Sequence, residues 1–279
     1  MLRDLHNHTL ASDGSLEPAA LLDMAVEKGI DEIAITDHDS VDGLMEIHAN
    51  KAQWSLNIID GVELSANWAK QTIHIVGLNI DPRHSGLTSF IKLQKSKRQQ
   101  RALQMAHKLE QSGLTGSVAD IEYMADQQNM VCRTHLAQYL LERGAVNSFA
   151  NAFKQYLAKG AKAFVPDEWF ALEDAVAIIR QAGGVAVLAH PTRYKLSSNK
   201  LQQLVVDFKS AGGQAIEVCY PNINPGQKNL LANWANKHNL LGSQGSDFHA
   251  LDKPWAQLGK FPTMPQEVTP VWNLWDPSS

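Results

Sequence analysis

The sequence predicts an α/β fold with a seven-stranded sheet, open or closed into a barrel, and a small helical insertion. Two patterns support the sheet: short apolar runs alternate with helix-length amphipathic segments, and polar residues of the kind that bind metals follow many of these runs. Such alternation is typical of parallel strands joined by helices. A third observation is an internal region with helical patterns only, which predicts the insertion.

The expected elements follow in chain order. A helix over 17–29 is indicated by Pro18 near its start and Gly29 at its end, the usual positions for both residues. The other predicted barrel helices lie near 171–182, 199–211 and 226–238. The predicted strands are 2–6, 32–36, 56–66, 72–80, 184–190, 214–220 and 240–249.

The alternation stops between about Gly86 and Pro166. A long helix ending at Gly113 and shorter helices near 117–127, 133–143 and 148–158 are predicted there. We expect a barrel domain of 1–99 with 166–279, and an insertion subdomain of 100–165. The tail from Pro254, rich in proline and tryptophan, is expected to be irregular and to pack on the surface.

Composition narrows the class of protein. The 279 residues carry a formal net charge of -4, which argues against binding nucleic acid through bulk charge. Two cysteines are too few for a disulfide framework and suit a reducing cytoplasm. We find no signal-peptide pattern and no apolar run long enough to span a membrane, so we expect a cytoplasmic protein without a membrane partner.

Histidines and carboxylates at strand ends are the strongest functional signal. His6 and His8 are two residues apart and therefore lie on one face of an extended chain. Each residue has an ordinary alternative, such as a helix cap, but nine coincidences at strand ends are implausible. The nine candidates are His6, His8, Asp13, His38, Glu63, His74, His190, Asp247 and His249.

The carboxyl ends of barrel strands carry the chemistry in such folds, so these side chains are expected to converge. His74 fits less well, because it lies early in its predicted strand and would have to point into the barrel interior. Imidazole and carboxylate ligands suit Zn, Mn or Fe. Nine ligands exceed what one ion takes, so two or three ions are expected.

Six segments resemble the successive motifs of the polymerase and histidinol phosphatase (PHP) superfamily, and the helical insertion with its "RTHLA" segment resembles the TrpH-type phosphoesterase branch. The segments are "DLHNHTLASDG", "ITDHDSVDG", "GVELSA", "IHIVGL", "LAHPTRY" and "GSDFH". The resemblance implies a distorted (βα)7 barrel and three ions, commonly Mn²⁺. It places His6, His8, Glu63 and Asp247 on the first ion. It places Glu63, His74 and His190 on the second, and Asp13, His38 and His249 on the third.

The activity implied by the resemblance is hydrolysis of the 3′-phosphoester of nucleoside 3′,5′-bisphosphates and of short 5′-monophosphorylated RNA, from 5′ to 3′. Glu63 and Asp247 are the implied catalytic carboxylates, and His190 or His249 is a candidate to assist the leaving oxygen. Arg133 and His135 at the start of a helix, and Arg193 three residues after His190, are candidates to bind a second phosphate. Arg98 and Arg101 share a helix face, which is either a further phosphate site or a solvated surface.

Two other classes of function remain open. One is a histidinol-phosphatase-like or other small-molecule phosphatase. The other is a non-enzymatic module with the same fold, which we would expect to lack some ligands, whereas none is missing here. No obligate protein partner is evident; the expected substrate is a nucleotide or short single-stranded RNA.

Overall fold

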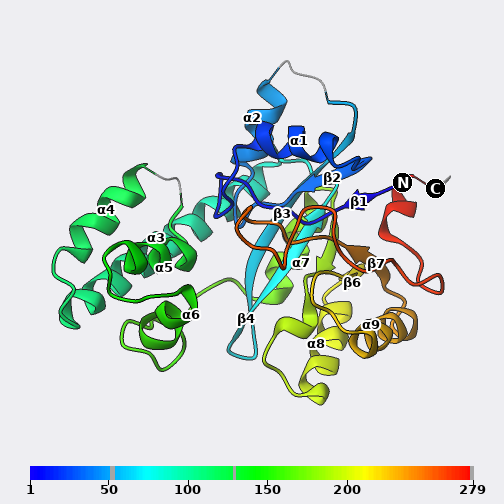
Figure 1. Ribbon diagram of the computed structural model, residues 1–279. Coiled ribbons are helices and arrows are strands. Elements are labelled where there is room, and N and C mark those ends of the chain that lie inside the picture. The colour runs from blue at the N-terminus through cyan, green and yellow to red at the C-terminus, as the bar shows by residue number, and fades with distance from the viewer. Residues whose placement is uncertain (51–53, 128–129, 277–279) are drawn as a thin grey trace. The chain divides into compact units, whose positions relative to one another are not determined.

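The computed structural model describes residues 1–50, 54–127 and 130–276 and divides the chain into two compact units (Figure 1). The barrel unit contains Met1–Phe90 and Phe170–Ser279, and the helical unit contains Ile91–Trp169. The expected insertion of 100–165 lies within the helical unit. The helical unit begins earlier and ends later than expected, and the two residues that flank it, Phe90 and Phe170, pack against each other in the barrel unit with ring centroids 4.4 Å apart.

Seven strands form one sheet in the order β1 to β7, as the sequence predicts. The outer strands meet as well: the backbone N–H of Leu5 donates to the carbonyl of Gln244 at 3.2 Å, and that of His8 donates to the carbonyl of Phe248 at 2.9 Å. The sheet is therefore a nearly closed barrel. The strands are β1 (Arg3–Asp4), β2 (Glu32–Ile35), β3 (Asn57–Trp68), β4 (Gln71–Leu78), β5 (Val185–Leu188), β6 (Ala215–Cys219) and β7 (Leu241–Gln244).

The expectation of an all-parallel sheet is wrong at β4, which runs antiparallel to both β3 and β5. Strands β3 and β4 form the long hairpin visible in Figure 1, joined through Ala69 and Lys70. Both residues have left-handed backbones, with φ of 46° and 62°. This turn normally carries Asn-Gly or Gly-Gly, so the sequence gives no hairpin signal here.

The reversed direction of β4 explains the place of His74. Ile75 pairs with Leu188, so the amino end of β4 lies at the carboxyl end of β5. His74 is thus beside Ala189, whose N–H donates to the His74 carbonyl at 3.1 Å. An early position in an antiparallel strand brings this histidine to the same edge as the ligands that follow the parallel strands.

Helices cover the outside of the barrel unit: α1 (Pro18–Glu27), α2 (Asp42–Ala49), α7 (Leu172–Gln181), α8 (Ser198–Ser210) and α9 (Pro225–Lys237). The short helix α2 is not among the predicted elements. The tail differs from the expectation of a surface segment, because Val271 and Trp272 are buried in the core. Trp272 also lies under the guanidinium of Arg3, 5.0 Å from its ring, so the tail closes part of the barrel core.

The helical unit has its own apolar core, which includes Leu109, Ile121, Leu136 and Leu140. Its elements are the greater part of α3 (Ser85–Gln111), with α4 (Ser117–Gln127), α5 (Arg133–Glu142), α6 (Phe149–Ala152) and a π-helical turn, η1 (Phe153–Leu157). Helix α3 begins in the barrel unit and is the chain's entry into the helical unit. The predicted helix over 148–158 is divided between α6 and η1.

Candidate metal centre

The nine predicted ligands come together in the barrel unit, around Glu63 of β3. Its Oε2 lies 3.3 Å from Nε2 of His6, 3.3 Å from Nε2 of His8 and 3.0 Å from Nδ1 of His38. Its Oε1 faces the other side, 3.0 Å from Nδ1 of His74 and 3.1 Å from Nε2 of His190. Each oxygen of one buried carboxylate therefore faces a different set of imidazoles.

Three overlapping groups of ligand atoms lie within 4.8 Å of one another: His6, His8, Glu63 and Asp247; His8, Asp13, His38 and His249; and His38, Glu63 and His74. The first group has the same members as the first ion set implied by the resemblance. The second adds His8 to the implied set of three. The third contains His38 in place of His190, whose Nε2 nevertheless lies 3.1 Å from Glu63.

The side chains fit divalent cations. Among the described residues, Nε2 of His6, Nε2 of His8, Nδ1 of His38 and Oε2 of Glu63 are buried and have no hydrogen-bond partner. A folded chain rarely leaves so many buried polar atoms unsatisfied, so their convergence indicates a cation site. The donors are nitrogen and oxygen atoms without thiolate, which suits Mn²⁺, Fe²⁺ or Zn²⁺.

The charges within the cluster interact strongly. Burial alone would raise the pKa of Glu63, but His38, His6 and His74 outweigh it and hold that pKa well below its usual range. Asp247 and Asp13 have lowered pKa values for the same kind of reason, with His6 and His249 respectively as the largest favourable neighbours. All three carboxylates are therefore ionised at neutral pH and ready to bind a cation.

The backbone at two of the ligands is unusual. His190 and Asp247 both have left-handed conformations, with φ of 30° and 50°. Such conformations in residues other than glycine are costly and concentrate at functional sites. The φ of 41° at Asp39 belongs to the same edge of the barrel, where its carboxylate accepts the N–H of Ser65 at 2.9 Å.

Supporting residues that the sequence does not single out surround the ligands. Asp37 accepts hydrogen bonds from the N–H and hydroxyl of Thr9, both at 2.7 Å, and from the hydroxyl of Ser12 at 2.6 Å, which fixes the loop between His8 and Asp13. Asp37 stands inside the "TDHD" motif, so its position was a usable signal.

Tyr194 bridges β4 and the residue that follows β5. Its hydroxyl accepts the N–H of His74 at 2.8 Å and donates to the carbonyl of Ala189 at 3.0 Å. Burial raises the pKa of this phenol well above its usual value, so it stays protonated and can donate. The hydroxyl thus replaces a direct bond between the strands next to two ligands, a role that sequence spacing does not reveal.

The predicted phosphate-binding residues lie in two places. Arg193 is in the barrel unit, where its guanidinium pairs with Oδ2 of Asp247 and lies over the ring of Tyr220, 5.3 Å from its centroid. Arg133 is in the helical unit, at the first position of α5. His135 uses its Nδ1 to accept the N–H of Cys132 at 3.1 Å and so caps this helix.

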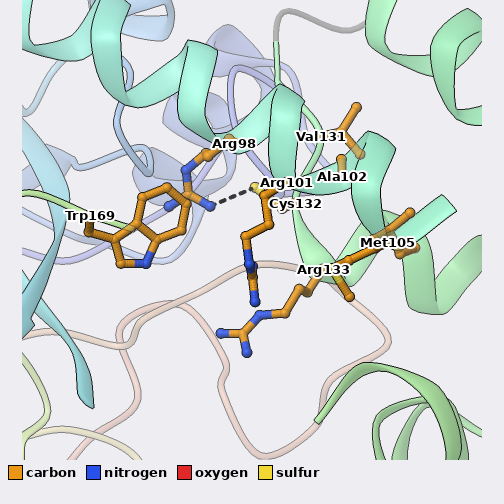
Figure 2. A pocket seen from close by; sticks show the side chains of 9 residues that line it. Arg98, Arg101, Ala102, Met105, Val131, Cys132, Arg133 and Trp169 are labelled. Carbon is orange, nitrogen blue, oxygen red and sulfur yellow. Dashed lines mark hydrogen bonds between the residues drawn. The ribbon is translucent and has the colours of Figure 1, made fainter. Parts of the chain in front are cut away.

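A small, open pocket in the helical unit is lined by Arg98, Arg101 and Arg133 (Figure 2). Figure 2 shows Arg98 over Trp169, 4.7 Å from the ring, while Arg101 and Arg133 extend into the same space. Asp167 lies 2.8 Å from Arg101. Burial, opposed by Asp167 and reinforced by Arg133 and Arg98, lowers the pKa of Arg101 to about 10, so the group remains charged at neutral pH. The pocket is suited to an anion.

No helix among residues 1–50, 54–127 and 130–276 is long and apolar enough to cross a lipid bilayer.

Known proteins resemble this chain over nearly its whole length. Residues 4–182 match the model of the PHP domain. The chain is 42% identical over 278 residues to the 5′-3′ exoribonuclease Rnm of Escherichia coli K12. The aligned region covers 99% of this chain and 94% of that protein. It is 38% identical over 270 residues to the 3′,5′-nucleoside bisphosphate phosphatase of Chromobacterium violaceum, covering 97% of this chain and 95% of that protein.

Among solved structures, an amidohydrolase from Chromobacterium violaceum with bound sulfate and no metal superimposes with a TM-score of 0.90 and 38% identity. The match covers 98% of this chain and 95% of that one.

Proposed function

Because the chain belongs to the PHP domain family, we propose that it is a metal-dependent phosphoesterase acting on nucleotides and short RNA. In this proposal it hydrolyses the 3′-phosphoester of nucleoside 3′,5′-bisphosphates and degrades 5′-monophosphorylated RNA from 5′ to 3′. The observation that carries the proposal is the buried ligand cluster around Glu63, in a chain about 40% identical to an exoribonuclease and a bisphosphate phosphatase.

The resident ions in this proposal are three Mn²⁺, held by the nine residues of the candidate metal centre. Bound ions would lower the pKa of water and neutralise charge on the phosphoryl group, which are the main requirements of phosphoester hydrolysis. Glu63 serves as the shared ligand, since its two oxygens face different imidazoles. Asp247 completes the first set, and Arg193 holds its second oxygen.

The leaving 3′-oxygen needs a proton or a bound ion, and His190 and His249, which would hold ions in this proposal, are the candidates to assist it. The ring of His249 has its Nδ1 2.9 Å from the carbonyl of Asp247, which leaves Nε2 directed toward Asp13 at 3.4 Å. Both side chains are ordered by their neighbours, so either ring would be held in a fixed orientation.

The arginine pocket of the helical unit is proposed to bind the 5′-phosphate. Three guanidinium groups line this pocket, where Asp167 pairs with Arg101 at 2.8 Å, and guanidinium groups are well suited to bind a terminal phosphate. Arg133 also stands at the start of α5, where unsatisfied backbone N–H groups favour anions.

A cytoplasmic location is part of the proposal, since the two buried cysteines, Cys132 and Cys219, form no disulfide.

A substrate panel tests the proposed function. Purified protein with Mn²⁺ should release phosphate from adenosine 3′,5′-bisphosphate far faster than from histidinol phosphate, and the chelated protein should be inactive. Preference for histidinol phosphate, or full activity after removal of every ion, would overturn the proposal.

A further inference from the structure

A buried carboxylate outside the nine predicted ligands contacts two of them. Glu217 lies on β6 and is 1% exposed. Its Oε1 accepts a hydrogen bond from Nδ1 of His6 at 2.7 Å, and its Oε2 accepts the backbone N–H of His190 at 2.5 Å. Both oxygens are occupied by these donors, and Glu217 belongs to none of the three ligand groups found among the described residues.

The contact with Glu217 fixes the tautomer and direction of His6. A carboxylate only accepts hydrogen bonds, so Nδ1 of His6 carries the hydrogen. The lone pair of Nε2 then points to the opposite side, where Oε2 of Glu63 lies at 3.3 Å and Oδ1 of Asp247 at 3.5 Å. A metal-binding histidine typically has its other nitrogen held in this way.

The second contact acts on the backbone of His190. This residue is left-handed, with φ of 30° and ψ of 54°, and it precedes Pro191, which disfavours helical backbone angles. The hydrogen bond from its N–H to Glu217 helps to hold that conformation. As a result the ring stacks near His6, with centroids 5.7 Å apart, and its Nε2 reaches Oε1 of Glu63.

We propose that Glu217 is a positioning residue that couples two ion sites. His6 belongs to the group on one oxygen of Glu63 and His190 to the ligands on the other, so a single carboxylate sets the geometry of both. The coupling predicts that loss of Glu217 weakens ion binding on both sides of Glu63. This inference rests on the proposed metal-dependent function, but its test measures ion binding without substrate.

The decisive variant is Glu217→Gln, which keeps the shape of the side chain. Its amide oxygen can accept from only one of the two donors, while its NH₂ group faces the other N–H. We expect the affinity for Mn²⁺ to fall about tenfold to a hundredfold, which is the usual effect of substituting a residue that forms a hydrogen bond to a metal ligand. Titration calorimetry on the chelated full-length protein would measure it. The visible spectrum of the Co²⁺-loaded protein should also change.

The matched control is Glu32→Gln. Glu32 is a strand carboxylate of similar burial, 3% exposed, that pairs with Arg3 at 3.2 Å and contacts none of the nine ligands. This variant should lose thermal stability and bind Mn²⁺ as the wild type does. Wild-type affinity in Glu217→Gln, or an equal loss of affinity in Glu32→Gln, would overturn the proposal.

A measurement on the wild type keeps the proposal testable if Glu217→Gln does not fold. Nitrogen-15 NMR of the metal-free protein should show His6 with hydrogen on Nδ1, as an exchange-protected downfield imidazole proton. Hydrogen on Nε2 alone would contradict the assigned role. Failure of the proposed hydrolysis with normal ion binding would instead refute the proposed function and leave this inference standing.

Discussion

Glu63 is the residue on which the candidate metal centre most depends, because its two oxygens face five imidazoles between them. Glu63→Gln replaces one of these oxygens with an NH₂ group that cannot bind a cation. We expect kcat on adenosine 3′,5′-bisphosphate to fall by more than about 100-fold, since even residues behind metal ligands cost 10–100-fold. Steady-state kinetics in excess Mn²⁺, with the metal content of the variant measured alongside, would check this. Unchanged kcat would mean that Glu63 is not a shared ligand.

Substitution of Arg133 should distinguish recognition of the 5′-phosphate from hydrolysis at the metal ions. Removing a hydrogen bond between charged groups costs about 1.5–3 kcal/mol. Arg133→Ala should therefore lower kcat/KM for substrates with a 5′-phosphate roughly tenfold to a hundredfold or more. An aryl phosphate, which lacks the second phosphate, should be hydrolysed almost as before.

Arg143 at the opposite end of α5 provides the control for Arg133. It pairs with Asp120 at 3.1 Å and does not line the arginine pocket, so Arg143→Ala should leave both activities near wild type. Equal losses on both substrates in Arg133→Ala would point to a structural role for Arg133.

At the residue scale, spacing and position beside strands were enough to predict the nine side chains that the structure brings together. Residues that form hydrogen bonds to the ligands, without being ligands themselves, were not predictable in the same way. Glu217 and Tyr194 look like ordinary strand and loop residues in the sequence, and their importance depends on contacts with ligands 211 and 120 positions away, respectively. Such contacts appear only once the strands are ordered in the sheet.

At the scale of elements, one hydroxyl bridges backbone groups at the end of the β4–β5 pairing, beside the direct hydrogen bond from the N–H of Ala189 to the carbonyl of His74. Tyr194→Phe would leave the N–H of His74 and the carbonyl of Ala189 without their bridge. An unsatisfied buried group costs about 1–3 kcal/mol, so the free energy of unfolding should fall by a comparable amount. Urea denaturation would measure it.

Tyr123→Phe is the matched control for Tyr194→Phe, because Tyr123 is 68% exposed and should tolerate the change. The weakened strand junction should also lower Mn²⁺ affinity, since His74 and His190 flank it. Wild-type stability in Tyr194→Phe would show that the hydroxyl bridge does not hold these strands.

The order and approximate bounds of the strands followed from apolar patterns, but the direction of β4 did not. Ala69 and Lys70 form a left-handed turn without the residues that usually announce one, so tertiary pairing of the hairpin overrides local preference. The buried tail was also missed, because prolines and tryptophans carry no strand or helix period. Its Val271 and Trp272 are recognisable as core residues only in the folded chain.

At the scale of the whole molecule, ion removal should change stability as well as activity. Ions that bind only the folded chain stabilise it by about 2.7 kcal/mol at 100 times their Kd. The melting temperature should therefore rise on addition of Mn²⁺ to the chelated protein and fall again with chelator. A melting temperature that is indifferent to Mn²⁺ would contradict an ion site built into the barrel core.

The stability of the metal-free protein should also depend on pH, through the titration of His8. Burial alone would lower the pKa of His8, but Asp247 and Glu63 raise it to about 10. The stabilising contribution of charged His8 is complete below its unfolded value near 6.5 and is lost as pH rises toward 10. We expect the wild-type melting temperature to fall over this interval more than that of His8→Gln. Equal pH dependence in the two proteins would exclude His8 as the titrating group.

One molecule is proposed to recognise a 5′-phosphate and to cleave the next phosphoester. Digestion of short single-stranded RNA with Mn²⁺, labelled either at its 5′-phosphate or at its 3′ end, tests this most directly. We predict immediate release of labelled mononucleotide from the 5′-labelled strand and progressive shortening of the 3′-labelled strand, with 5′-hydroxyl RNA much slower. Internal cuts, or mononucleotides released first from the 3′ end, would contradict the claim.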